Sequence, residues 1–514
     1  MNGADVVVRT LLSQGVDLCL ANPGTSEMHF LAAVDANPGM RAVLALQENV
    51  ATGAADGYAR ITGRPAATLL HLGPGLANGL SNLHNAARAL SPVVNIVGDH
   101  AMDHHSYDAP LTSDIEGLSR TFSVSTRTIS PGRGAAAQIE GAVADSLGIK
   151  PGVATVLLPA DSAWSPADLP DTIAARAVRP ETGIDPLAVR AAVDALCQPG
   201  AVLLLGYGGT RGQALVDAGR IAARTGAQLM AQTASPVTDR GAGTPALERL
   251  PYPLDLATAR LAKVPVIVLA GSKAPVAFFA YPGKKSKLYA PHTHLLELSR
   301  PQDDTAAYLA AVAEECGAAP VAKPAGGAIP QIPTDRFDAA AVGAVLARLL
   351  PENCIFVDEG LTNGLPIFTA TAHAAPHRWL QNMGGSIGFA APMTIGCALA
   401  EKGTPVIAMI GDGSAMYTLQ SLWTQAREQL HVVTLILANR TYNILKDEVR
   451  NLDLRNRGAA IQDMLSIDNP LLDFVKLAEG MGVPARRVDS TTGLQDALTT
   501  ALKTKGPSLI EVTL

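Results

Sequence analysis

Residues 405–414 read PVIAMIGDGS, and residues 432–441 read VVTLILANRT. Each stretch is an apolar run of strand length that ends in a polar turn, and the intervening residues predict a helix over Met416–Glu428. A strand, a helix and a second strand in this order form the right-handed crossover unit of a parallel sheet. This unit indicates an α/β fold and brings the carboxyl ends of its two strands to one edge of the sheet.

Asp412 and Asn439 directly follow these two strands, so we expect their side chains to converge. A carboxylate, an amide oxygen and nearby backbone carbonyls suit Mg²⁺, and phosphate oxygens can fill its remaining positions. The start of the helix, which we expect after Ser414, would supply free N–H groups for the phosphate. The alternative is a tight strand-to-helix turn beside an unrelated asparagine.

Outward from this unit, short β-branched runs alternate with helical stretches through most of the 514 residues. This alternation is typical of parallel sheets covered by helices. Proline-rich segments at 165–179 and 317–334 are predicted linkers. They leave three domains over residues 1–165, 185–318 and 335–514, so the predicted fold class is α/β with three doubly wound parallel sheets.

Composition excludes several classes of protein. Charged residues make up only 17% and hydrophobic residues 48%, so much of the chain is expected to be buried, partly in a subunit interface. A net charge of −6 without a Lys/Arg block argues against nucleic-acid binding. The sequence shows no signal-peptide pattern and no apolar run of the ~20 residues that span a membrane. Five scattered cysteines favour a reducing cytoplasm over a zinc site or disulfide framework.

Two polar residues of the first domain lie where predicted strands end. Glu48 begins a helix directly after a strand, where burial would suit it to exchange a proton. The alternative for Glu48 is a first-turn carboxylate stabilised by the helix dipole. His71 ends the strand over 67–71 and is either a proton relay or a core histidine.

Two glycine-rich segments complete the candidate site. Gly73 begins the sequence GPG, followed by Asn78, which predicts a loop that a ligand can approach closely, or a simple turn. Residues 383–389 read MGGSIGF and include Gly385 and Ile387. They either pack against a helix or expose carbonyls beside a cofactor.

Together, these residues resemble thiamine-diphosphate-dependent enzymes of the acetolactate synthase/benzoylformate decarboxylase superfamily. The resemblance covers nearly the whole chain and is strongest at residues 22–25 (NPGT), 48–60 and 411–439. It implies that the three predicted domains are, in chain order, a pyrimidine-binding domain, a middle domain and a diphosphate-binding domain.

The resemblance also implies how Mg²⁺ and the diphosphate would be held. Asp412, Asn439 and the carbonyl of Thr441 would bind the metal ion. Direct contacts to the phosphate groups would come from Gly413, Ser414 and Thr362.

The rest of the cofactor is assigned in the same way. Glu48 would hydrogen-bond the aminopyrimidine ring, and the carbonyl of Gly385 would accept a hydrogen bond from the amino group of that ring. Ile387 would enforce the bent conformation of the cofactor. Gly73 and Asn78 are the further cofactor-binding candidates.

The catalytic residues implied by the resemblance are Glu48, His71 and Thr25, the last at the position of the catalytic serine of benzoylformate decarboxylase. That enzyme's second catalytic histidine would fall within residues 274–282, which contain no histidine. The adjacent histidines at 104–105 resemble a pair in pyruvate decarboxylases, with a solvated loop as an equal alternative.

The implied activity is decarboxylation or carboligation of a 2-oxo acid through an enamine, with thiamine diphosphate and Mg²⁺. Alternatives are an acetolactate synthase proper, a weakly active cofactor-binding regulatory paralogue, and an unrelated α/β nucleotide-binding enzyme. Active sites of the family lie between subunits, which implies a homodimer or homotetramer. FAD binding stays open, since residues 206–209 (GYGG) could mark an FAD site.

Overall fold

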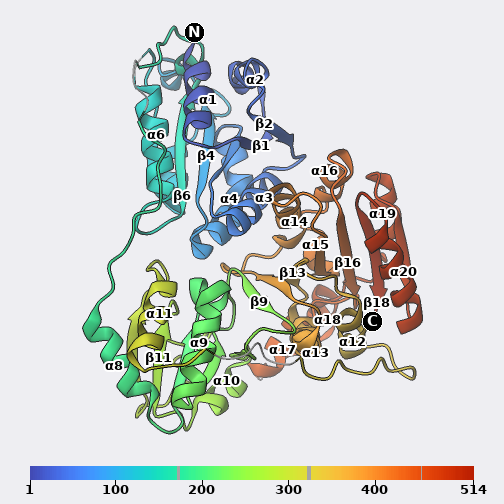
Figure 1. Cartoon of the computed structure of the whole chain (residues 1–514). Helices are drawn as coiled ribbons and strands as arrows, with labels where there is room; N and C mark the ends of the chain where they lie inside the picture. The colour runs from blue at the N-terminus through green and yellow to red at the C-terminus, as the bar shows by residue number, and fades with distance from the viewer. Residues whose placement is uncertain (133, 171–173, 321–325, 453) are drawn as a thin grey trace.

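The computed structural model describes residues 1–132, 134–170, 174–320, 326–452 and 454–514. Three sheets with helices packed on them form three lobes, coloured mainly blue to cyan, green to yellow, and yellow to red in Figure 1. The predicted α/β class with three parallel-dominated sheets is confirmed.

The first sheet is entirely parallel, in the order β2-β1-β3-β4-β6-β5. Its inner strands β3 and β4 are buried along their whole length, because helices cover both faces. The strands are β1 (Leu18–Asn22), β2 (Arg41–Leu44), β3 (Ala66–Leu70), β4 (Val93–Asp99), β5 (Ser123–Thr128) and β6 (Val153–Pro159). The helices are α1 (Gly3–Ser13), α2 (Met28–Asp35), α3 (Glu48–Thr62), α4 (Leu72–Ala89), α5 (Ile115–Arg120), α6 (Ala135–Ser146) and α7 (Ala160–Trp164).

The second sheet is also parallel, in the order β10-β8-β7-β11-β12. The chain starts at the central strand β7 and builds outward in both directions, as in doubly wound folds. The strands are β7 (Val202–Leu205), β8 (Gln228–Ala231), β10 (Glu248–Arg249), β11 (Val266–Ala270) and β12 (His294–Ser299). The helices are α8 (Pro186–Leu196), α9 (Gly212–Thr225), α10 (Leu254–Leu261) and α11 (Thr305–Glu315).

The third sheet has the order β17-β18-β16-β15-β13-β14-β9, and it includes one antiparallel pair. The edge strand β9 (Thr238–Arg240) comes from the middle of the chain and pairs with β14, which the sequence analysis did not anticipate. The other strands are β13 (Ile355–Glu359), β14 (His377–Gln381), β15 (Val406–Gly411), β16 (Val432–Ala438), β17 (Ala485–Val488) and β18 (Ser508–Thr513). The helices are α12 (Ala339–Leu349), α13 (Gly364–Ala370), α14 (Ala390–Ala400), α15 (Asp412–Ala415), α16 (Ser421–Arg427), α17 (Asn443–Asn451), α18 (Ala459–Leu465), α19 (Phe474–Gly480) and α20 (Thr491–Lys503).

The first and third lobes pack through α3 and α14 (Figure 1). A buried ion pair lies on α3. Arg60 and Asp56 lie 2.6 Å apart on α3 with side chains almost fully buried. The Arg60 guanidinium also donates to the carbonyl of Gln381 at the end of β14, at 2.6 Å. Removing Asp56 would leave the Arg60 charge buried without its partner, so the ion pair holds Arg60 in position for its contact with β14.

Two local expectations were wrong. Of the helix predicted over Met416–Glu428, only α16 forms, and a separate helical turn, α15, precedes it and begins at Asp412 rather than after Ser414. Thr418 lies between α15 and α16, and its hydroxyl donates to the carbonyl of Gly388 at 3.0 Å.

The GPG sequence was the second wrong expectation, since it forms the first turn of α4 and not a loop. A proline fits there because the first N–H groups of a helix have no intrahelical partner. The strained residue of this connection is Leu72, with φ +49°. Within the part of the chain that the structure describes, no helix combines the length and apolarity needed to cross a membrane.

Candidate active site

Glu48 begins α3 at the carboxyl edge of the first sheet. Its side chain is buried, and the Asn78 amide of α4 donates to Glu48 Oε2 at 3.1 Å. A Cβ at Gly75 would lie 3.4 Å from Glu48 Oε1 and 3.3 Å from the Cβ of His71. The absence of a side chain at Gly75 therefore lets the Glu48 carboxylate approach the first turn of α4, beside the base of the His71 side chain.

His71 is oriented by two side chains from the segment after β1. Its Nδ1 lies 2.9 Å from Glu27 Oε2 and 3.3 Å from the Ser26 hydroxyl. Glu27 is buried and also accepts the Gly24 N–H at 2.7 Å, which fixes the carboxylate. With Nδ1 so engaged, Nε2 is the nitrogen left to act on a substrate.

The sequence analysis missed Glu27 and Ser26 and named Thr25 in this segment instead. Thr25 is exposed, whereas the adjacent Ser26 is the hydroxyl that contacts His71. The available signal was a glutamate three residues after Gly24, which is the spacing of a capping box.

Three further histidines gather after β4. The His100 ring centroid lies 5.1 Å from that of His104 and 6.1 Å from that of His105, and His105 Nε2 lies 3.3 Å from Asp99 Oδ2. Burial raises the pKa of Asp99, and burial together with the neighbouring His104 lowers the pKa of His100. His71 also lies within electrostatic range of His100, so the group adjoins the end of β3. Sequence reasoning found the pair at 104–105 and missed His100.

In the third lobe, Asp412 and the turn after β16 lie side by side, as neighbouring strands require. Asp412 Oδ2 accepts the Arg440 N–H at 2.5 Å, and Asn439 Oδ1 accepts the Thr441 N–H at 3.2 Å. Arg440 has a φ of +59°, a strained conformation of the kind that clusters at functional sites. Burial raises the pKa of Asp412.

Ser414 provides a test of whether a phosphate group suits this place. Its hydroxyl is buried and has no hydrogen-bond partner among the described residues. An orphaned hydroxyl of this kind costs free energy unless a ligand completes it. Gly413 lies against the ring of Tyr442, and Thr362 lies in the turn after β13, which contacts α17. The Gly413 N–H already donates to Asp412 Oδ1 at 2.9 Å, so among these groups the Ser414 hydroxyl is the free donor that fits an oxygen of an anionic group.

The segment 384–388 is held from both lobes. Asn82 and Asn85 of α4 donate to the carbonyls of Gly388 and Ser386 at 3.2 and 2.9 Å. Gly388 has a φ of +84°, which favours glycine. Gly385 is exposed and Ile387 half-buried, and these are the two residues of the segment assigned to the cofactor.

An aromatic group from the loop after β11 faces this segment. The Phe278 ring reaches within 3.8 Å of the Cβ position of Gly385 and packs on Tyr252 at 5.0 Å. Tyr281 anchors the same loop by donating to Glu448 of α17 at 2.9 Å. Residues 274–282, where the resemblance implies a second catalytic histidine, thus present an apolar ring at this place.

Glu359 is the buried carboxylate of this region. It accepts the N–H groups of Gly388 and Ala390 at 2.5 and 2.8 Å, and burial raises its pKa to about 7. A raised pKa means that folding favours the protonated acid. The contribution of Glu359 to the stability of the folded protein is therefore complete below about pH 4.5, the ordinary pKa of a glutamate. It is lost as the pH rises through 7.

Glu359→Gln should consequently flatten the pH dependence of stability. Between pH 5 and 8 the wild type should lose about 2.5 kcal/mol more unfolding free energy than the variant, at about 1.4 kcal/mol per pKa unit. Urea denaturation at the two pH values measures this difference. Glu352→Gln, an exposed carboxylate of the same domain, is the control. Equal pH slopes for wild type and Glu359→Gln would contradict the assignment.

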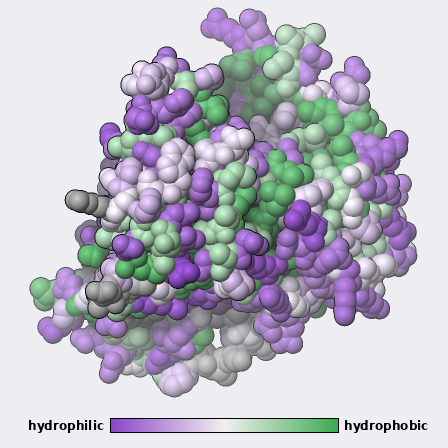
Figure 2. All heavy atoms as spheres, turned by 90° about the horizontal axis from the view of Figure 1, so that it is seen from above, coloured by the Kyte–Doolittle hydropathy of each residue, from purple (hydrophilic) through white to green (hydrophobic). Residues whose placement is uncertain are grey.

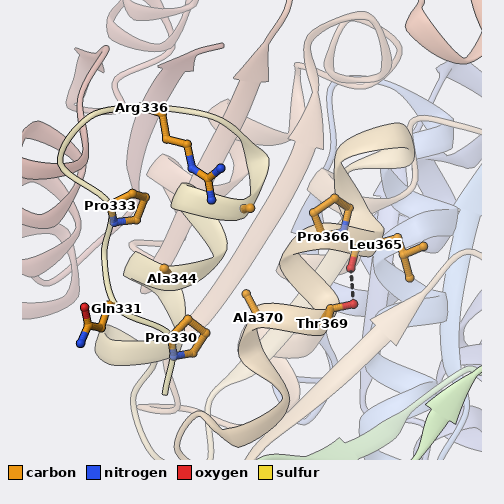
Figure 3. A pocket seen from close by; sticks show the side chains of 10 residues that line it. Pro330, Gln331, Pro333, Arg336, Ala344, Leu365, Pro366, Thr369 and Ala370 are labelled. Atoms are coloured by element: carbon orange, nitrogen blue, oxygen red, sulfur yellow. Dashed lines mark hydrogen bonds between the residues drawn. The ribbon is translucent and has the colours of Figure 1, made fainter. Parts of the chain in front are cut away.

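A separate cavity of about 430 Å³ lies under the segment that leads into the third domain. Figure 3 shows Pro330, Pro333 and Arg336 of that segment on one side and Leu365 and Pro366 of α13 on the other. Arg336 lies 3.7 Å from Asp338, and the rest of the lining offers no acid–base pair. The chemistry is therefore concentrated at the carboxyl edges of the first and third sheets.

Comparison with known proteins identifies the family of this chain. Models of the thiamine pyrophosphate enzyme family match residues 1–118 (N-terminal TPP binding domain) and 366–512 (C-terminal TPP binding domain). The chain is 47% identical to the acetolactate synthase large-subunit-like protein IlvX of Mycobacterium tuberculosis, over all of this chain and 99% of IlvX. The chain belongs to the thiamine-diphosphate-dependent enzymes. This confirms the predicted family and thiamine diphosphate as its cofactor.

Other relatives of this thiamine-diphosphate-dependent enzyme are more distant. Benzoylformate decarboxylase of Pseudomonas aeruginosa is 27% identical, over 98% of this chain and 97% of the relative. The solved structure of the 4-hydroxybenzoylformate decarboxylase of Rhodococcus jostii RHA1 superposes with a TM-score of 0.88, at 24% identity, covering 100% of this chain and 99% of that one. This last likeness shows the shared fold.

Proposed function

We propose that this enzyme decarboxylates a 2-oxo acid with Mg²⁺ as its second cofactor and can also join the product to another carbonyl compound. The observation that carries the proposal is the convergence of Glu48 and His71 on the first turn of α4. One group can exchange a proton with the cofactor while the other delivers a proton to the substrate.

The donor set of the third lobe fits Mg²⁺ and a diphosphate. Asp412, Asn439 and the Thr441 carbonyl would hold the metal ion, because carboxylate, amide and carbonyl oxygens are its preferred protein ligands. Gly413, the orphaned hydroxyl of Ser414 and Thr362 would contact phosphate oxygens. When bound, thiamine diphosphate supplies an electron sink for the electron pair released as carbon dioxide leaves.

The chain's own residues position the reactants and move protons. Glu48, held by Asn78, would hold a proton at a ring nitrogen of the aminopyrimidine. The Gly385 carbonyl would accept a hydrogen bond from the amino group of that ring. Ile387 would support the bent cofactor, and Gly73 lies in the same helix turn as Gly75. Phe278 would exclude water, which favours the loss of a charged carboxylate.

His71 would donate the proton that completes aldehyde formation. We expect His71→Ala to slow aldehyde release by about 10²–10⁴, the usual scale for a general acid, and to raise the share of 2-hydroxyketone. The measurement supplies pyruvate and benzoylformate separately and quantifies aldehyde, 2-hydroxyketone and acetolactate. Acetolactate as the main product from pyruvate would indicate an acetolactate synthase proper.

His29→Ala is the control, because His29 is exposed on α2 and contacts Trp164 instead of the site. If His71→Ala leaves both rate and product ratio unchanged for every substrate turned over, His71 is a structural histidine. In that case the proposal loses its proton donor.

We also propose a homodimer or homotetramer with the active site between subunits. Figure 2 shows apolar side chains gathered around a hollow on one face of the molecule, with polar side chains on its rim. Exposed large apolar residues occur near both halves of the candidate site and include Leu46, Leu361, Met416 and Tyr417. Apolar patches of this kind mark interaction surfaces. All five cysteines are free, which supports our assignment of the enzyme to the cytoplasm.

A further inference from the structure

A second cavity, of about 140 Å³, lies where the first lobe, the segment before α8 and the second sheet meet. Its lining includes Arg60, Arg179, Tyr207, Arg211 and Asp303. Arg60 lies near the C-terminal end of α3, whereas Glu48 begins that helix. At 1.5 Å per residue the two ends are roughly 18 Å apart, so the cavity is distinct from the candidate active site.

The cavity lies at the edge of the second sheet where ligands of open parallel sheets bind. Strand order there is β8-β7-β11, and the chain continues from β7 to opposite sides of the sheet. Tyr207 lies two residues after the end of β7 and adopts a φ of +41°. The carboxyl ends of strands at such a reversal form a crevice.

Positive charge is concentrated around this crevice in a chain whose net charge is −6. Arg179 and Arg211 line the cavity close enough for each to affect the other electrostatically. Lys273 lies within electrostatic range of Arg88 and Lys150, whose neighbours along the chain also line the cavity. Among the described residues, none of these five cations has a carboxylate within ion-pair distance.

The two acidic groups near the cavity already have hydrogen-bond partners within the protein. Asp303 lines the cavity, but its carboxylate binds Arg300 at 2.9 Å. Asp304 accepts the Ala307 N–H at 3.0 Å as the cap of α11. Arg179 donates to the carbonyl of Gln302 at 2.7 Å, and Asp304 and Asp303 act on it electrostatically without forming an ion pair with it. The charged side chains that line the cavity are three arginines and one aspartate, so their sum is positive.

FAD, which the family resemblance left open for residues 206–209, does not fit here. The Gly212 N–H at the start of α9, where a dinucleotide phosphate would bind, already donates to Asp239 Oδ2 at 2.7 Å. The Tyr207 hydroxyl crosses to the carbonyl of Arg88 at 2.7 Å. The cavity is also smaller than the ~300–1,000 Å³ of sites that enclose a ligand of drug size or larger.

We propose that this cavity binds a small phosphate-bearing anion, held chiefly by Arg179 and Arg211. Guanidinium groups suit phosphate because their planar N–H donors match its oxygens in pairs. Arg88, Lys150 and Lys273 add long-range attraction at the mouth. Arg60 is engaged by Asp56 and contributes to the wall instead of the binding.

The test uses the enzyme saturated with thiamine diphosphate and Mg²⁺, so that the diphosphate site is filled. Calorimetric titration with inorganic phosphate should give saturable binding with a dissociation constant of about 1 mM or lower. Arg179→Glu combined with Arg211→Glu should weaken it at least tenfold. Arg9→Glu with Arg348→Glu, two exposed arginines outside the cavity, makes the same change in net charge and should leave binding unchanged.

Arg179→Gln with Arg211→Gln provides a milder pair should the charge reversal prevent folding, and it should weaken binding in the same direction. Binding that does not saturate by 50 mM phosphate, an adventitious ion only, would overturn the proposal. So would equal weakening by the control pair, or stoichiometric retention of FAD by the purified enzyme.

Discussion

Glu48→Gln is expected to slow exchange of the cofactor's C2 proton by about 10²–10⁴ while the fold stays intact. Glu48 is buried at the start of α3 and held by Asn78, so an amide of the same shape fits the space. An amide cannot take up and release the proton that the carboxylate shares with the pyrimidine ring. Rapid-quench NMR of hydrogen–deuterium exchange at C2 measures this step without relying on substrate turnover.

Glu116→Gln, on the exposed side of α5, is the matched control and should leave the exchange rate unchanged. A wild-type rate of C2 proton exchange in Glu48→Gln would show that Glu48 does not activate the cofactor, whatever the effect on overall turnover. It would also leave the first-turn position of Glu48 explained by the helix dipole alone.

Asp412→Ala should abolish Mg²⁺-dependent binding of thiamine diphosphate, because it removes the only carboxylate assigned to the metal ion. At a ligand concentration of 100 times Kd, binding stabilises the folded enzyme by about 2.7 kcal/mol, and this increment should vanish. Thermal unfolding with thiamine diphosphate, with and without Mg²⁺, measures the loss.

Asp412 also accepts the N–H of the strained Arg440, so its removal can loosen the turn itself. Asp412→Asn keeps an acceptor for that N–H and lacks the charge, and it should lose Mg²⁺ dependence as well. Asp496→Ala, on the exposed face of α20, controls for a generic loss of charge. Retained affinity and Mg²⁺ dependence in Asp412→Asn would show that the ion is bound elsewhere.

The parallel sheets could be predicted because their strands are apolar runs long enough to stand out, such as β4 and β16. Strand β9 could not be predicted, because it has three residues, two of them charged, and pairs with a strand far along the chain. Secondary structure that depends on a distant partner leaves little local pattern.

The same distinction applies to the candidate site. Asp412, Asn439 and Glu48 were found because they follow strands, and strand ends are where parallel sheets bind ligands. Glu27 was missed because its role depends on contact with His71, 44 residues away. The split between α15 and α16 depends likewise on the contact of Thr418 with Gly388.

The pairing of β9 with β14 has a consequence for how the chain is made. Roughly 140 residues separate the two strands, so at 5–20 residues per second the ribosome needs on the order of ten seconds between them. Through that interval β9 has no partner strand, and the second sheet can close without it. Completion of the third sheet is thus the event that joins the middle of the chain to its C-terminal part. Slowing synthesis between the two strands should lengthen the time during which nascent chains are sensitive to proteases.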